Sequence, residues 1–117
     1  FTNFSRSQEL SRAKAFEADL AESVRAQALF VVTGVSEAFL DLRTAHRAVQ
    51  IQAQNRRASE ESLQLATERY RVGSGTFFEL NDAQLADLTA QFDYVNSIYD
   101  YHKALALLEA AVGRSLR

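Results

Sequence analysis

Apolar residues in the first two thirds of the chain recur at alternating spacings of four and three residues, which is the pattern of a coiled-coil seam. The pattern covers fourteen positions, eleven of them apolar, and predicts a helix from about residue 5 to about residue 70. Ser5 and Gln8 fit a capping box at the start of this helix. The seam consists of Val24, Ala28, Val31, Val35, Ala38, Leu42, Ala45, Val49, Gln52, Arg56, Ser59, Leu63, Ala66 and Tyr70.

A second helix is predicted from about residue 78 to about residue 112, and it carries two apolar stripes. The first stripe consists of Phe78, Leu85, Leu88, Phe92, Val95, Tyr99 and Ala106. The second stripe consists of Tyr94, Ile98, Tyr101, Leu105, Leu108 and Val112. One partner helix covers only one side of a helix. We therefore expect the second stripe to have no partner within a hairpin, and the isolated chain to self-associate through it.

Glycines mark the turn and the end of the second helix. Gly73 and Gly75 place a turn at residues 71–77, and Gly113 is suited to the residue after the helix end. Gly34 lies inside the first helix, where either a close helix crossing or a local bend would explain it. The prediction is an all-α protein, a long antiparallel coiled-coil hairpin. Because the first helix is much longer than the second, its first third lacks a partner, which indicates a piece of a larger assembly.

The composition agrees with long helices and excludes several functions. The chain has 117 residues with 19 Ala, four Gly and no Cys, Pro, Met or Trp. The absence of Cys excludes disulfides and thiolate sites. A net charge of −2 argues against a nucleic-acid partner held by phosphate contacts. No arrangement of residues indicates catalysis, a metal site or a cofactor, and no apolar run is long enough for a membrane-spanning helix.

Three segments resemble the TolC-like outer membrane efflux proteins. Residues 66–84 resemble the hairpin-tip motif of that family, with Arg-Tyr, a Gly three residues after the Tyr, then Thr, and a Leu followed by Asp-Ala-Gln. Residues 101–113 resemble its closing pattern, an Ala- and Leu-rich helix that ends in Ala-Val-Gly. Residues 1–4 resemble the end of the strand that leads into the long helix. The second of the two family repeats fits better than the first.

The resemblance implies that the chain, residues 1–117, is a periplasmic hairpin segment of a homotrimeric α-barrel channel. The parent protein is then held in the outer membrane of a Gram-negative bacterium by a β-barrel outside this segment. Its expected partners are a periplasmic adaptor protein and an inner membrane transporter. The alternative is the structural coiled-coil hairpin of a periplasmic adaptor, although such hairpins lack this tip motif.

The resemblance also implies roles for individual residues. Adaptor docking is expected at the tip, at Val72, Gly73, Ser74 and Gly75. Tyr70 matches a gate residue, but an aromatic residue that ends the seam explains it equally well. Glu79 and Asp82 match acidic positions of the pore constriction. Their simpler explanation is a charged first helical turn, stabilised by the helix dipole.

Overall fold

Two helices make up nearly all of the computed structural model, which describes residues 2–116. Helix α1 extends over Thr2–Arg71 and helix α2 over Phe77–Val112. Residues 2–4 are helical, so the expected strand end at residues 1–4 is wrong for these three residues, and Phe1 lies outside the described residues. Because α1 already includes Ser5, the capping box predicted there is also wrong as a helix start.

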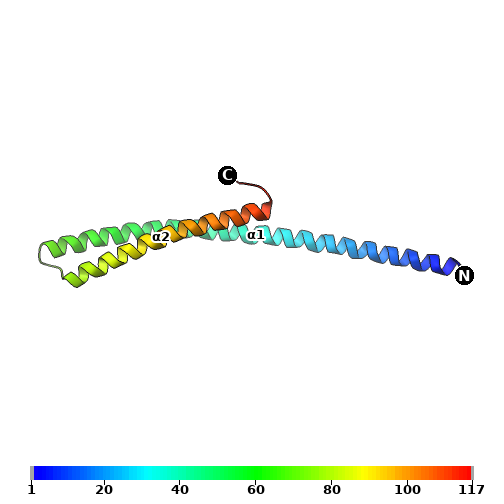
Figure 1. Ribbon diagram of the computed structural model, residues 1–117, viewed down its shortest axis with the longest axis horizontal. Coiled ribbons are helices and arrows are strands. Elements are labelled where there is room, and N and C mark those ends of the chain that lie inside the picture. The colour runs from blue at the N-terminus through cyan, green and yellow to red at the C-terminus, as the bar shows by residue number, and fades with distance from the viewer. Residues whose placement is uncertain (1, 117) are drawn as a thin grey trace. The chain divides into compact units, whose positions relative to one another are not determined.

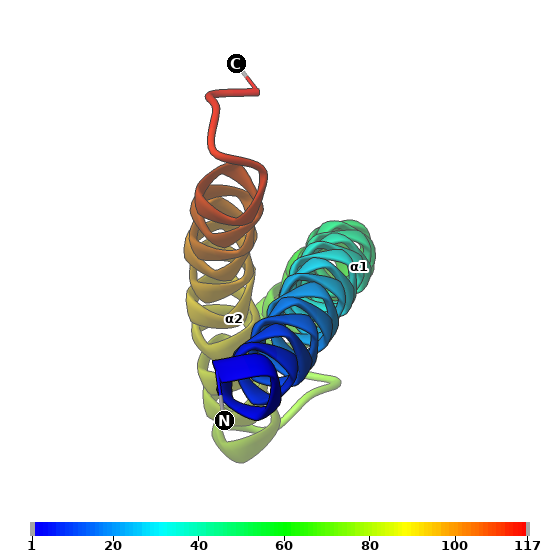
Figure 2. The same cartoon turned by 90° about the vertical axis from the view of Figure 1, so that its right-hand side faces the viewer.

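The chain divides into two units, Phe1–Glu37 and Ala38–Arg117. The first unit is the N-terminal part of α1, and from Leu10 to Val32 its large apolar side chains are exposed. The second unit contains the rest of α1, the turn and α2, which lie side by side as an antiparallel hairpin (Figures 1 and 2). The predicted all-α hairpin fold is therefore confirmed. Within residues 2–116 neither helix has a stretch apolar enough to cross a bilayer.

The predicted seam of α1 is the face that packs on α2. Within the second unit, the less exposed residues of α1 repeat the predicted spacing from Ala38 to Ala66. Arg56 is an exposed member, and its guanidinium carbon lies 5.4 Å from the centre of the Tyr94 ring on α2. The centres of the His46 ring on α1 and the Tyr101 ring on α2 are 5.9 Å apart, which is a second contact between the two helices. Many seam residues are Ala, which lets the two backbones approach closely.

Helix α2 turns a different face to α1 than we predicted. The stripe from Tyr94 to Leu108 packs against α1, and Leu108 is only 6% exposed. The first stripe is instead the uncovered one, with Phe78 79% exposed. The covered face repeats at three and four residues through Leu80, Ala83, Asp87, Ala90, Tyr94, Ser97, Tyr101, Ala104 and Leu108. The prediction was wrong because the small and polar members of this seam hide its period.

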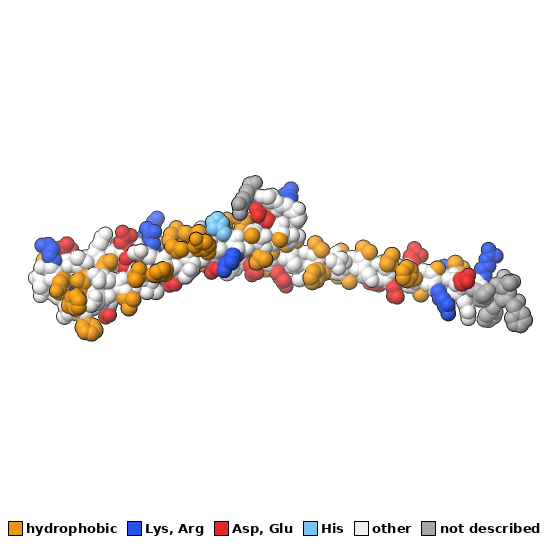
Figure 3. Space-filling model, in the orientation of Figure 1, with side chains coloured by type: hydrophobic (Ala, Val, Ile, Leu, Met, Phe, Trp, Pro, Cys, Tyr) orange, Lys and Arg blue, Asp and Glu red, His pale blue; other side chains and the backbone are white. Residues whose placement is uncertain are grey.

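The buried core of the hairpin is small. Among the described residues, Ala104 and Leu108 are the apolar side chains classed as buried, and Asp87 and Ser97 are the polar ones. Many large apolar side chains remain at the surface of both helices, and Figure 3 shows hydrophobic side chains along the hairpin and along the N-terminal part of α1. Burial of apolar surface supplies most of the free energy of folding, so a single hairpin of this kind is weakly stabilised by its own contacts.

Candidate functional site: the turn between the helices

The C-terminal end of α1 is closed by a Schellman motif centred on Gly73. The Ser74 amide donates a hydrogen bond to the Arg69 carbonyl at 2.8 Å, and the Gly73 amide donates to the Tyr70 carbonyl at 3.1 Å. This motif needs a left-handed residue after the helix end, and Gly73 has φ of +77°. Gly73 therefore has a backbone conformation that a residue with a Cβ atom rarely adopts. Gly113 closes α2 with φ of +74° and its amide donates to the Glu109 carbonyl.

Gly75 is required for a different reason, namely lack of space. A Cβ atom at this position would lie 3.0 Å from the Arg69 Cβ and 3.1 Å from the Tyr70 backbone nitrogen. The Gly75 amide also donates a hydrogen bond to the Arg69 carbonyl at 2.9 Å, which holds the turn against the last turn of α1. A larger residue at this position would displace the turn. The space around Gly73 is by contrast open.

Helix α2 begins with a capping box formed by Thr76 and Glu79. The Thr76 amide donates to the Glu79 carboxylate at 2.8 Å, and the Glu79 amide donates to the Thr76 hydroxyl at 3.2 Å. The backbone hydrogen bond from Thr76 lowers the pKa of Glu79 below its usual value, and the nearby Arg69 charge adds to this. The Thr-x-x-Glu spacing could have revealed this box in the sequence, but it was missed.

The other predicted site residues surround this turn. Val72, Ser74 and Tyr70 are exposed, and the centre of the Tyr70 ring lies 6.2 Å from the centre of the Phe77 ring. Asp82 is exposed one helical turn after Glu79 and lines a shallow groove with Ser59 of α1 and Leu85 of α2. The turn therefore brings the seven predicted residues to one end of the hairpin: Tyr70, Val72, Gly73, Ser74, Gly75, Glu79 and Asp82.

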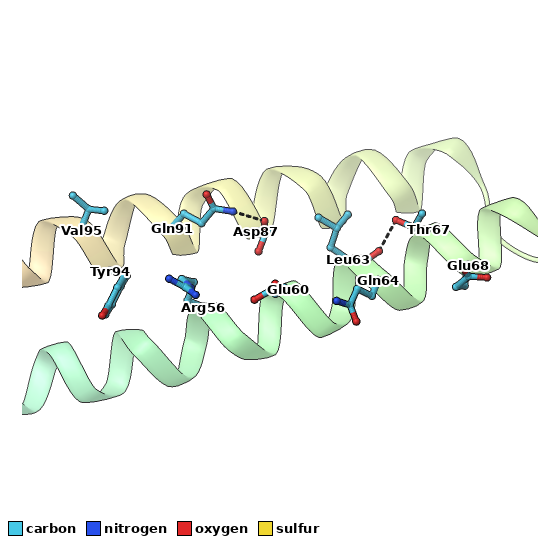
Figure 4. A pocket seen from close by; sticks show the side chains of 10 residues that line it. All are labelled: Arg56, Glu60, Leu63, Gln64, Thr67, Glu68, Asp87, Gln91, Tyr94 and Val95. Atoms are coloured by element: carbon cyan, nitrogen blue, oxygen red, sulfur yellow. Dashed lines mark hydrogen bonds between the residues drawn. The ribbon is translucent and has the colours of Figure 1, made fainter.

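An open groove further along the hairpin has Asp87 among its lining residues (Figure 4). Asp87 accepts hydrogen bonds from the Ser59 hydroxyl at 3.3 Å and from the Gln91 amide at 2.7 Å. Arg56 and Tyr94 lie next to each other at one end of the groove. Sequence reasoning did not single out Asp87, although the period of the α2 seam could have located it.

The sequence model of one family, described as outer membrane efflux protein, matches residues 1–114. The chain belongs to the outer membrane efflux protein family. No curated protein and no solved structure is similar enough to the chain to be matched with it. The suspected family is thus confirmed, and it is a family of efflux channels of the Gram-negative outer membrane. This assignment favours a channel component over the hairpin of an adaptor.

Proposed function

We propose that this member of the outer membrane efflux protein family forms part of the periplasmic tunnel of a homotrimeric export channel. Its hairpin turn docks onto a periplasmic adaptor protein, which couples the channel to an inner membrane transporter. Small molecules or proteins pass through the tunnel to the outside. Three lines of support come from the family match, from the uncovered face of α2 and from the rigid, capped turn.

The observation that carries the proposal is the uncovered first stripe of α2, from Phe78 to Tyr99. This stripe repeats every three and four residues, as a coiled-coil seam does, and lies on the side of α2 opposite to α1. A helix with seams on two opposite sides is suited to a wall of helices, in which every helix has a neighbour on each side. A closed tube built from three copies would cover this stripe.

The turn is suited to docking because its backbone is held in one conformation. Hydrogen bonds to the Arg69 carbonyl on one side and the Thr76 capping box on the other fix residues 72–76. Val72 is exposed and supplies an apolar contact, while Ser74 beside it supplies a polar one. In this proposal the adaptor contacts the surface formed by Val72, Gly73, Ser74 and Gly75.

We assign Tyr70 to the gate and Glu79 with Asp82 to the pore constriction. Three copies of the two carboxylates would form a negatively charged ring that favours cations. Glu79 also serves the capping box, so Asp82 is the carboxylate that is committed to no cap. Tyr70 is on the last turn of α1, where its ring lies close to Phe77 at the start of α2.

Thiol labelling of the full-length parent protein tests the tube directly. A cysteine at Leu88, on the exposed stripe, should react with a water-soluble maleimide far more slowly in the outer membrane than in guanidinium. A cysteine at Ser62, an exposed polar position of α1 that flanks its seam and is not opposite to it, is the matched control and should react quickly in both states. Equal reaction rates at the two positions in the membrane would rule out a tube that covers this stripe.

A further inference from the structure

Helix α2 buries its more polar face and exposes its more apolar one. The buried face carries Asp87 and Ser97, each 7% exposed, whereas the exposed face carries three Phe or Leu residues within two helical turns, namely Leu85, Leu88 and Phe92. Burial of apolar area alone favours the opposite arrangement. Since both faces repeat with the same spacing, the seam of α1 would fit either of them.

Polar residues of the two seams meet at one point. Ser59 interrupts the seam of α1, and its hydroxyl lies 3.3 Å from Oδ1 of Asp87. The same hydroxyl lies 3.0 Å from the Arg56 carbonyl oxygen, but an ionised carboxylate is the stronger acceptor. Gln91 donates to Oδ2 at 2.7 Å, so both carboxylate oxygens of Asp87 have a donor.

The exposed stripe offers Ser59 no comparable partner. If α1 packed on that stripe, apolar side chains such as Leu85 and Leu88 would surround Ser59. Asp87 would then face water, which costs little, but the hydrogen bond between Ser59 of α1 and Asp87 of α2 would be lost. A polar residue in a coiled-coil seam is known to select one pairing at some cost in stability.

We propose that the pair Ser59 and Asp87 selects the face of α2 that packs against α1. Their hydrogen bond turns the seam of Asp87 inward and thereby keeps the stripe of Phe78, Leu85, Leu88, Phe92, Val95 and Tyr99 outward for another contact. The two residues are positioning residues. The proposal concerns the hairpin alone and does not depend on export or on adaptor docking.

Cysteine pairs report which face of α2 is turned inward. Leu63 and Ala83 each lie four residues nearer the turn than Ser59 and Asp87, so a cysteine pair at these positions should form a disulfide. A pair at Leu63 and Leu85 is the matched control for the outer face. The chain has no cysteine of its own, so the introduced thiols are the only ones.

Ser59→Ala should raise the disulfide yield of the outer pair and lower that of the inner pair. Asp87→Leu alone should keep the inner pair dominant, because an apolar residue then replaces the carboxylate and Ser59 retains the Arg56 carbonyl. In the double variant the inner pair should again dominate. The two substitutions should be coupled by about tenfold in the unfolding equilibrium constant, as contacting residues often are.

Two results would overturn this proposal. One is Ser59→Ala with wild-type disulfide yields for both pairs and wild-type stability. The other is a double variant whose loss of stability equals the sum of the single losses, because that means that the two residues act independently. Each variant is the full 117-residue chain, and circular dichroism checks that it remains helical.

Discussion

At the scale of single residues, the structure requires glycine at Gly73 and at Gly75 for two different reasons, and neither reason applies at Gly34. Gly73 is needed for its left-handed backbone and Gly75 for lack of space. An ideal Cβ at Gly34 has no heavy atom within 4 Å, so no close crossing is seen at this position among the described residues. Whether Gly34 allows a close helix crossing or a local bend can therefore be decided only in the assembled protein.

Substitution of Gly34 and Gly75 by Ala should change stability in opposite directions. Gly34→Ala should stabilise the chain by about 1 kcal/mol, because Ala is the better helix former. Gly75→Ala should destabilise it, because its Cβ meets the backbone of Arg69 and Tyr70. Urea unfolding followed by circular dichroism measures both. A stabilising Gly75→Ala would mean that the turn leaves room for a Cβ atom between residue 75 and the end of α1.

Glu79 should make stability depend on pH. Its pKa is lowered in the folded chain, chiefly by the hydrogen bond from the Thr76 amide, so its ionised form stabilises α2. This contribution is present above the unfolded pKa of about 4.3 and is lost as the pH falls through the lower folded value. Wild type should therefore be more stable than Glu79→Gln at neutral pH but not at strongly acidic pH.

The matched control for Glu79 is the other member of the capping box. Thr76→Ala removes the hydroxyl that accepts from the Glu79 amide, and this typically costs about 0.5 to 2 kcal/mol. That loss should persist at acidic pH, because the hydroxyl does not titrate. An advantage of wild type over Glu79→Gln that is equally large at both pH values would contradict the assigned role of the Glu79 charge.

At the scale of the helices, the two faces of α2 should respond differently to truncation. Leu108→Ala should cost about 2 to 5 kcal/mol, because Leu108 is 6% exposed. Leu85→Ala should change stability by less than about 0.5 kcal/mol, because Leu85 is 64% exposed, but it should weaken self-association of the chain. Urea unfolding and analytical ultracentrifugation separate the two effects. Equal losses of stability would mean that both faces are covered.

The helices show how far sequence patterns reach. The seam of α1 was predictable because eleven of its fourteen members are apolar and the spacing continues past the polar members Gln52, Arg56 and Ser59. The seam of α2 was not predictable, because Asp87 and Ser97 are polar and Ala83 is small. Hydrophobicity alone selects the face with the largest apolar side chains. The packing of this hairpin depends instead on small residues and on one matched pair of polar residues.

The candidate site was predictable only in part. The position of the turn and the need for a left-handed Gly73 follow from local sequence. The lack of space at Gly75 depends on how the turn folds back on Arg69 and Tyr70, which no local pattern encodes. The capping role of Glu79 follows from its spacing from Thr76, so this part of the site was predictable from local sequence.

At the scale of the whole channel, the carboxylates of Glu79 and Asp82 should set ion preference. Changing them to Gln and Asn removes six negative charges from a trimer at little cost in volume. Single-channel recordings of the full-length protein should then show weaker cation preference and weaker block by divalent ions. Tyr70→Ala is the comparison variant and should raise the leak conductance without changing ion preference. Unchanged selectivity in the neutralised variant would place both carboxylates outside the pore.

In the proposed channel, the turn of this hairpin docks onto a partner that export requires. Trp at Gly73 would block the surface but also strain a residue with φ of +77°, so Ser74→Trp is the cleaner change. Ser74→Ala is the matched control, because it changes the same position without adding bulk. The measurement is export by cells that carry the full-length variants at equal levels in the outer membrane. Ser74→Trp should abolish export while Ser74→Ala retains it. Export at the wild-type level by Ser74→Trp would contradict docking at this turn.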